Sequence, residues 1–257
     1  MNWHFVNTGF NTGKFNMEYD LHLAKCFKPD EAVLRLYRWK PYCISLGANQ
    51  SFDSINIGKA SADNIDVVKR PTGGRAILHS EELTYSVIIP LYQNSSVRQI
   101  YSEVNEALAT GLSFYSKKLA SVELEKSQPD FKEYYKNEYS SACFAIPAKS
   151  ELKFDGKKLV GSAQRKLGNV ILQHGSILCG DLHKNIVEYL AVDEINYKKI
   201  TALLNQTSDL KAITGQELNY ELLAQSISGG FESYFKMKLN HLKADTLFVP
   251  GEELICN

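Results

Sequence analysis

Two consecutive glycines, Gly73 and Gly74, lie in a short polar segment between two runs of β-type residues. The runs cover residues 66–68 and 76–78, and together they predict a strand, a loop and a second strand. Because glycine has no β-carbon, the backbone of such a loop can approach a ligand to hydrogen-bonding distance. The Pro-Thr-Gly-Gly sequence by itself is also typical of an ordinary turn, so the flanking residues must decide between the two interpretations.

The side chains around these glycines favour a ligand-binding loop. Arg70, Arg75 and His79 supply hydrogen-bond donors on both sides of the glycines, and Thr72 adds a hydroxyl. Positive charges beside a backbone that can approach closely suit the carbonyl group of a thioester or an acyl phosphate. We therefore expect an acyl-binding loop at this position.

One of the five cysteines has the surroundings of a reactive thiol. Cys143 follows two serines and an alanine in a polar, turn-like stretch near lysines, whose charge can lower the pKa of a thiol. Cys26, Cys43 and Cys179 lie in apolar surroundings and are expected to pack as small hydrophobic residues. No Cys-x-x-Cys pair is present, so the sequence does not indicate a zinc site.

The composition excludes several broad classes of protein. Lys plus Arg and Asp plus Glu both number 29 in 257 residues, and this balance argues against a general nucleic-acid or membrane-surface binder. No apolar run could span a membrane, and the first residues lack a charged and then apolar targeting signal, so we expect a cytoplasmic protein. Neither a P-loop nor a Gly-x-Gly-x-x-Gly turn is present. No linker is visible, so residues 1–257 are expected to form a single domain.

Strand patterns occur early and late in the chain, and helix patterns at its start, middle and end. This order predicts an α+β fold with mixed or antiparallel sheets packed with helices, and not a doubly wound parallel sheet. Asp155-Gly156 and Gly168-Asn169 predict turns between late strands, and Gly229-Gly230 is expected to break or bend the last helix. Helices are expected at about 15–27, 96–119, 186–190, 195–204 and 217–235, and strands at about 32–39, 42–46, 67–69, 75–78, 84–89, 151–154, 158–165 and 170–177.

Several segments resemble the biotin and lipoate protein ligase superfamily. The run from Lys69 to His79 is similar to the Arg-Arg-x-Thr/Ser-Gly-Gly segment of its lipoyl branch, which ends in His. The run from Gly156 to Gln164 is similar to that branch's Gly-x-Lys-x-x-Gly-x-Ala segment, with Lys158 at the lysine position. The runs Ser141 to Pro147 and Val170 to Leu178 resemble the octanoyltransferases that work through an acyl-cysteine intermediate.

The resemblance implies a fold of the biotin/lipoate protein ligase catalytic-domain type, and it implies roles for particular residues. Cys143 would be the acylated nucleophile, and Lys158 would assist it with a positive charge; an exposed strand-edge lysine is the alternative for Lys158. Lys69 replaces the usual first arginine, so a paired contact with two substrate oxygens is not expected there. The implied substrate-binding residues are Arg70, Thr72, Gly73, Gly74, Arg75, His79, Gly161, Ser162 and Ala163.

The resemblance also implies the reaction and its partners. Octanoyl-acyl carrier protein is the expected donor, and a lysine of a lipoyl domain, first of all that of the glycine-cleavage H protein, is the expected acceptor. No cofactor, metal, nucleic acid or membrane is expected. Because acyl carrier proteins are acidic, we expect a basic rim to steer docking. Its candidates are Lys149, Lys153, Lys157, Arg165 and Lys166.

Three other functions remain open at this stage. An ATP-dependent lipoate-protein ligase would activate free lipoate, an octanoyl amidotransferase would move the acyl group between lipoyl domains, and a silent module would only bind a lipoyl domain. Retention of both Cys143 and Lys158 argues most strongly against the silent module. The sequence also leaves open whether His79 or His174 takes part in proton transfer.

Overall fold

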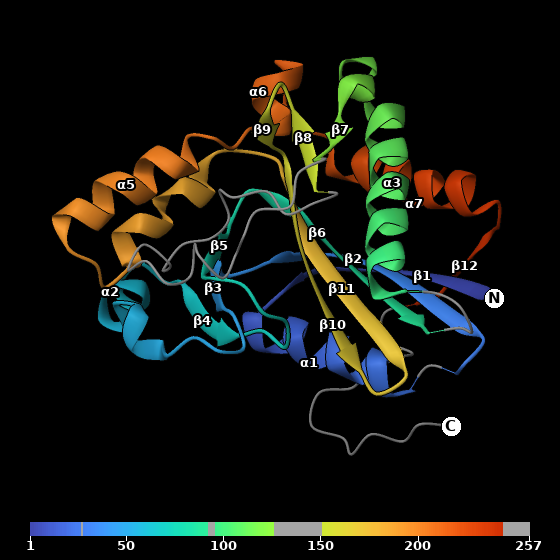
Figure 1. Ribbon diagram of the computed structural model, residues 1–257, viewed down its shortest axis with the longest axis horizontal. Coiled ribbons are helices and arrows are strands. Elements are labelled where there is room, and N and C mark those ends of the chain that lie inside the picture. Colours follow the sequence, from blue (N-terminus) through green and yellow to red (C-terminus); the bar gives the residue numbers. More distant parts are fainter. Residues whose placement is uncertain (27, 92–95, 126–150, 244–257) are drawn as a thin grey trace.

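A six-stranded mixed sheet forms the centre of the computed structural model, which describes residues 1–26, 28–91, 96–125 and 151–243 (Figure 1). In order across the sheet the strands are β10 (Val160–Leu167), β11 (Val170–Leu178), β6 (Glu82–Pro90), β2 (Glu31–Trp39), β1 (Asn2–Asn11) and β12 (Leu239–His241). Neighbouring strands from β10 to β2 pair antiparallel, whereas β2, β1 and β12 run parallel to one another.

Two small sheets and the helices complete the described architecture. One sheet has the order β4 (Asp66–Lys69), β3 (Cys43–Leu46) and β5 (Ile77–His79), and the other has the order β7 (Glu123–Leu124), β8 (Leu152–Phe154) and β9 (Lys157–Lys158). The α-helices are α1 (Gly13–Cys26), α2 (Ile57–Ala62), α3 (Val97–Tyr115), α5 (Glu194–Leu204), α6 (Leu210–Thr214) and α7 (Tyr220–Phe235). Short 3-10 helices are η1 (Phe52–Ser54), η2 (Lys117–Ser121) and η3 (Leu182–Tyr189). The predicted α+β class with mixed and antiparallel sheets is confirmed.

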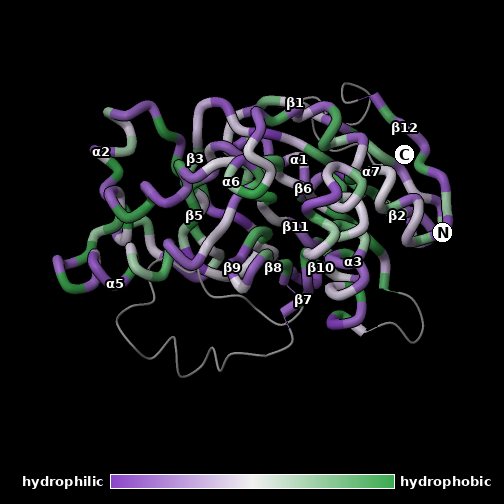
Figure 2. Tube along the Cα trace, turned by 90° about the horizontal axis from the view of Figure 1, so that it is seen from above, coloured by the Kyte–Doolittle hydropathy of each residue, from purple (hydrophilic) through white to green (hydrophobic). Residues whose placement is uncertain are grey.

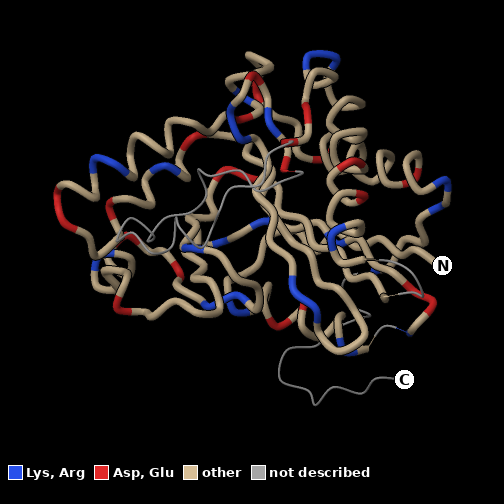
Figure 3. Tube along the Cα trace, viewed as in Figure 1, with Lys and Arg blue, Asp and Glu red and all other residues tan. Residues whose placement is uncertain are grey.

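The large sheet lies between α1 on one face and α3 with α7 on the other (Figure 1). Successive side chains of a strand point to opposite faces, so Leu34 of β2 packs toward α3 and α7 while Val33 packs toward α1. Apolar and polar stretches alternate along the chain, as the hydropathy colouring shows (Figure 2). Charges of both signs are spread over the molecule (Figure 3), in line with the balanced composition.

The first helix and the late hairpins form as their local signals predict. Thr12 Oγ1 accepts a hydrogen bond from the backbone N–H of Phe15 at 3.3 Å and so caps α1. Asp155 and Gly156 both have positive φ in the turn between β8 and β9, and Gly168 has φ 59° in the turn between β10 and β11. These backbone values are those that two-residue hairpin turns require.

The predicted break at Gly229-Gly230 is wrong. Helix α7 continues through both glycines to Phe235, because Gly230 lies directly against the backbone of Gly111 in α3. A β-carbon on Gly230 would overlap the backbone of Gly111, so the glycine allows two helices to approach closely. None of the helices in the described parts of the chain combines the length and apolar character that crossing a membrane requires.

Candidate active site

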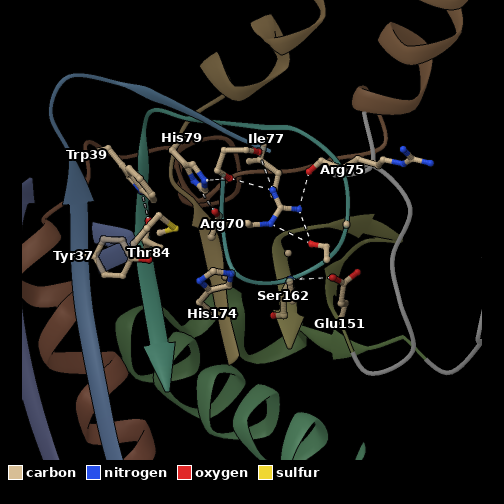
Figure 4. A pocket seen from close by; sticks show the side chains of 18 of the residues that line it. Tyr37, Trp39, Arg70, Arg75, Ile77, His79, Thr84, Glu151, Ser162 and His174 are labelled. Carbon is tan, nitrogen blue, oxygen red and sulfur yellow. Dashed lines mark hydrogen bonds between the residues drawn. The ribbon is translucent and has the colours of Figure 1, made fainter. Parts of the chain in front are cut away.

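A cavity opens where β10, β11 and β6 meet β5 and the loop after β4 (Figure 4). It encloses about 700 Å³ of space, open solvent at its mouth included. Nearly every predicted site residue that the structure describes lines it, although these residues come from distant parts of the sequence. They are Arg70, Gly73, Gly74, Arg75, His79, Lys158, Gly161, Ser162 and Ala163. Of the remaining two predicted residues, Thr72 is buried behind the wall and Cys143 lies outside the described residues.

Arg70 holds the glycine loop in shape. Its Nε and Nη2 both donate to the carbonyl of Gly73, at 3.2 and 2.8 Å, and Nη2 also donates to the carbonyl of Arg75 at 2.8 Å. Its Nη1 donates to the carbonyl of Ser45 at 2.8 Å. Gly74 has φ 93°, a value that favours glycine. The guanidinium of Arg70 therefore presets the loop, whereas that of Arg75 extends away from the other labelled side chains (Figure 4).

Lys158 and Glu151 form a buried ion pair on the cavity wall. Lys158 Nζ lies 2.9 Å from Glu151 Oε2, and the two side chains are only 5% and 3% exposed. The other carboxylate oxygen, Oε1, accepts from the backbone N–H of Ser162 at 2.9 Å. This burial excludes the alternative of an exposed strand-edge lysine. The Glu151 carboxylate fixes the position of the buried ammonium. Electrostatic catalysis requires a charge that is fixed in this way.

The hydroxyl of Ser162 is engaged on the side of α3. It accepts from the hydroxyl of Tyr85 at 2.7 Å and donates to Asn105 Oδ1 at 3.1 Å. Gly175 lies against the backbone of Gly161, where a β-carbon on Gly175 would overlap the Gly161 carbonyl. The 161–163 segment thus lines the cavity while Asn105 of α3 holds the Ser162 hydroxyl and β11 pairs alongside.

His79 belongs to a buried chain of hydrogen bonds. Its Nε2 lies 2.7 Å from Ser45 Oγ and its Nδ1 lies 2.8 Å from Glu82 Oε1. Trp39 stacks on the imidazole, with ring centroids 4.1 Å apart. Ser45 Oγ accepts from Arg70 Nη1 at 3.1 Å, so its own proton is available for His79 Nε2. Glu82 Oε1 also accepts from the hydroxyls of Thr84 at 2.5 Å and Ser176 at 2.8 Å, so the chain is anchored at this carboxylate.

His174 belongs to a second buried chain, which ends at a core ion pair. Its Nε2 lies 2.6 Å from Thr72 Oγ1 and its Nδ1 lies 3.5 Å from Asp20 Oδ2. Asp20 Oδ1 accepts from Arg35 Nη1 at 2.7 Å, and both of these side chains are fully buried. Burial lowers the pKa of His174. Burial by itself raises the pKa of Asp20, but the charge of Arg35 and the hydrogen bonds from His174 and Ser86 outweigh it and hold that pKa below its ordinary value.

Asp20→Asn should destabilise the fold by about 3–5 kcal/mol at neutral pH, because it leaves the charge of Arg35 buried without its counter-ion. The Asp20 pKa is lower in the folded than in the unfolded chain, so ionised Asp20 stabilises the fold above the unfolded Asp pKa of about 3.9, and this stabilisation is lost as the pH falls through the lowered pKa. Urea unfolding at several pH values measures both effects. Asp63→Asn, which breaks an exposed ion pair with Lys59, is the matched control and should cost much less.

The structure adds cavity residues that sequence reasoning missed. Glu151 is the most important, and Ser45, Trp39, Thr84 and Ser176 also line the wall. An acidic residue such as Glu151 at the start of a short strand, close in sequence to the turn that leads to Lys158, was an available signal. The other four residues lie on four different strands, β2, β3, β6 and β11, so they become recognisable only in the folded chain.

The cysteine and rim predictions have mixed outcomes. Cys43 and Cys179 are buried as expected, and burial raises the pKa of both thiols, that of Cys179 to about 12. Cys26 is only half-buried. In the predicted basic rim, Lys157, Arg165 and Lys166 are exposed, Lys153 pairs with Glu125, and Lys149 lies outside the described residues. The described part of the chain contains no group of three or more His, Cys, Asp or Glu side chains that could hold a metal ion.

Comparison with known proteins assigns the chain to a family. Residues 12–232 match the family described as Lipoyl protein ligase A/B catalytic domain. Octanoyltransferase LipM of Staphylococcus aureus is 31% identical to this chain over 249 residues, which are 94% of this chain and 90% of that relative. Octanoyltransferase LipM of Bacillus subtilis is 38% identical over 186 residues, which are 68% of this chain and 65% of that relative.

The fold agrees with that assignment. A solved structure of a bipartite lipoate protein ligase and its E2 lipoyl domain from Thermoplasma acidophilum has a TM-score of 0.73 at 17% identity, covering 95% of this chain and 87% of that chain. This likeness shows a shared fold and confirms the fold that the motifs implied. Since the family match spans most of the sequence, the chain belongs to the lipoyl protein ligase A/B catalytic domain family.

Proposed function

We propose that this chain works as one cytoplasmic catalytic domain that moves an octanoyl group from acyl carrier protein to a lysine of a lipoyl domain, with Cys143 as the transient acyl carrier. The observation that carries the proposal is the cavity, where the glycine loop, Lys158 and the 161–163 backbone converge. The relatives named octanoyltransferase support the identity of the acyl group. The family supports a lipoyl domain as the acceptor, and the glycine-cleavage H protein is our first candidate.

In the first half-reaction the Cys143 thiolate attacks the thioester carbonyl of the donor. A new C–S bond forms and the old one breaks, so one thioester replaces another at little net cost in free energy. The donor's sulfur leaves with the electron pair and takes up a proton. Lys158 supplies the positive charge that favours the thiolate, and the loop at Gly73 and Gly74 brings backbone close to the acyl group.

In the second half-reaction the acceptor lysine attacks the acyl-cysteine as a neutral amine. A C–N bond forms, the C–S bond breaks, the cysteine sulfur takes the electron pair, and the amine nitrogen loses one proton. The product is an octanoyl amide on the acceptor. Each half-reaction starts from a thioester, which is already an activated acyl group, so neither half-reaction needs ATP.

Octanoyl-acyl carrier protein and H protein, incubated with the purified chain, should therefore yield octanoylated H protein without ATP or magnesium. Intact-mass spectrometry measures the product, and it should also detect a single octanoyl group on the enzyme when the acceptor is omitted. The parallel reaction with free octanoate, ATP and magnesium is the comparison. Product in the octanoate reaction alone identifies a ligase. A third reaction uses an octanoylated lipoyl domain as the donor, and product in that reaction alone identifies an amidotransferase.

A further inference from the structure

Both histidines that line the cavity use both ring nitrogens within the protein. His79 contacts Ser45 and Glu82, at 2.7 and 2.8 Å. His174 contacts Thr72 at 2.6 Å through Nε2, and its Nδ1 faces Asp20. A general base must lie within hydrogen-bonding distance of the proton that it removes. Both imidazoles are thus already engaged in contacts that support the cavity wall, which favours another group as the proton acceptor for the amine.

Glu151 is the one carboxylate among the described residues that line the cavity. Its side chain is 3% exposed, so it can meet a substrate only from within the cavity. It holds Lys158 Nζ with one oxygen and the N–H of Ser162 with the other. An ionised carboxylate offers about four acceptor positions, so a group that holds these two donors can also take a proton. Figure 4 shows Glu151 on the same side of the cavity as Ser162.

We propose that Glu151 accepts the proton that the attacking lysine loses during acyl transfer. The assignment rests on the reaction proposed above. As the C–N bond forms, the amine nitrogen becomes positively charged and its proton passes to the Glu151 carboxylate. The electron pair of the breaking C–S bond goes to sulfur, and the proton then leaves Glu151 for solvent.

The ion pair suits both charges that this step creates. The departing thiolate is negative and the attacking nitrogen is positive, and Lys158 and Glu151 present the opposite signs 2.9 Å apart. Charges inside a buried cavity interact more strongly than in water, because the surrounding dielectric constant is lower. In the transfer step the pair therefore supports the departing sulfur through Lys158 and the attacking amine through Glu151.

Glu151→Gln tests the assignment, because glutamine has the same size but cannot take up the proton. Acylation of the enzyme by octanoyl-acyl carrier protein, measured by intact-mass spectrometry, should slow much less than transfer does, and only because the Lys158 ammonium loses the carboxylate that holds it. Transfer from the isolated acyl-enzyme to H protein should fall by about 100-fold, at the low end of the effect of general-base catalysis. The deficit should shrink as the pH approaches the lysine pKa of about 10.4, where solvent hydroxide takes over.

Hydroxylamine provides a second acceptor that separates the roles. It is uncharged at neutral pH and a far weaker base than lysine, so its attack depends much less on a protein base. Transfer to hydroxylamine should therefore stay near the wild-type rate in Glu151→Gln. Glu151→Asp keeps the charge beside Lys158 and should therefore retain acylation. Its rate of transfer to H protein should lie between the rates of wild type and Glu151→Gln. This variant takes the place of Glu151→Gln if the glutamine variant does not fold.

Glu232→Gln is the matched control. Glu232 likewise holds one backbone N–H, that of Leu239, and one ammonium, that of Lys238, at 3.0 and 3.1 Å, but it lies on α7 away from the cavity. Both half-reactions should be unchanged in this variant. Equal slowing of both half-reactions in the Glu151 variants, or an unchanged transfer to H protein, overturns the assignment alone. A wild-type enzyme that takes up no octanoyl group overturns the proposed function, and the assignment with it.

Discussion

Cys143→Ala should abolish octanoyl transfer to the acceptor, because alanine has no group that can carry the acyl chain between the two half-reactions. The expected loss is complete within the sensitivity of the assay, and no octanoyl adduct should form on the enzyme. Intact-mass spectrometry of the variant after incubation with octanoyl-acyl carrier protein measures the adduct, and octanoylated H protein measures the transfer. Peptide mapping of the wild type should place the octanoyl group on Cys143.

Two buried thiols in the described part of the chain provide an internal control. Cys43 and Cys179 are buried, and burial raises the pKa of each, so they should carry no octanoyl group in either protein. Near wild-type transfer by Cys143→Ala, or an octanoyl label on either buried thiol, contradicts the acyl-cysteine mechanism at this position.

The elements that could be predicted from the sequence are those whose signals are local. The glycine loop is an example, since Gly74 needs a positive φ and the flanking runs have β-type residues. The turns at Gly156 and Gly168 follow the same rule. The motifs also identified the residues that converge on one cavity, with Lys158 among them. Local backbone chemistry and family motifs were therefore sufficient to single out residues that line one cavity.

The remaining features depend on contacts between distant segments. Strand β1 has no clean alternation of apolar and polar residues, and it is stabilised by parallel pairing with β2 and with β12 near the other end of the chain. Gly230 is a helix breaker by propensity, but close packing against Gly111 outweighs that preference. The role of Glu151 follows from its 2.9 Å contact with Lys158, which only the folded hairpin brings about.

The support beneath the site was also beyond sequence reasoning. Seen in the sequence, His79 is a candidate ligand or base, and His174 is a histidine in an apolar strand. In the fold each is the middle of a chain from a hydroxyl to a buried carboxylate. These chains end at Glu82 and Asp20, which lie on different elements from the loop that they support. The two hydrogen-bond chains form because the fold packs separate elements together, and no local motif indicates them.

Lys158→Met should slow acylation of Cys143 by about 100- to 1,000-fold, the range found when one positioned electrostatic group is removed from an active site. Methionine resembles the aliphatic part of lysine and lacks the charge, so the thiolate loses its positive neighbour. The same change leaves the buried carboxylate of Glu151 without its counter-ion, which should cost about 3–5 kcal/mol in stability. Acylation reactions quenched at set times and analysed by intact-mass spectrometry measure the first effect, and urea unfolding measures the second.

The double variant Lys158→Met/Glu151→Gln distinguishes a catalytic from a purely structural lysine. It removes both charges at once, and replacement of a buried ion pair by neutral groups is far less costly than loss of one partner, so stability should recover toward that of the wild type. Acylation should remain as slow as in Lys158→Met, because the positive charge is still missing. Recovery of acylation together with stability would mean that Lys158 acts only through the fold. Lys158→Arg, which keeps the charge but changes its shape, should fall between wild type and Lys158→Met, since a planar guanidinium cannot occupy the position of a compact ammonium beside Glu151.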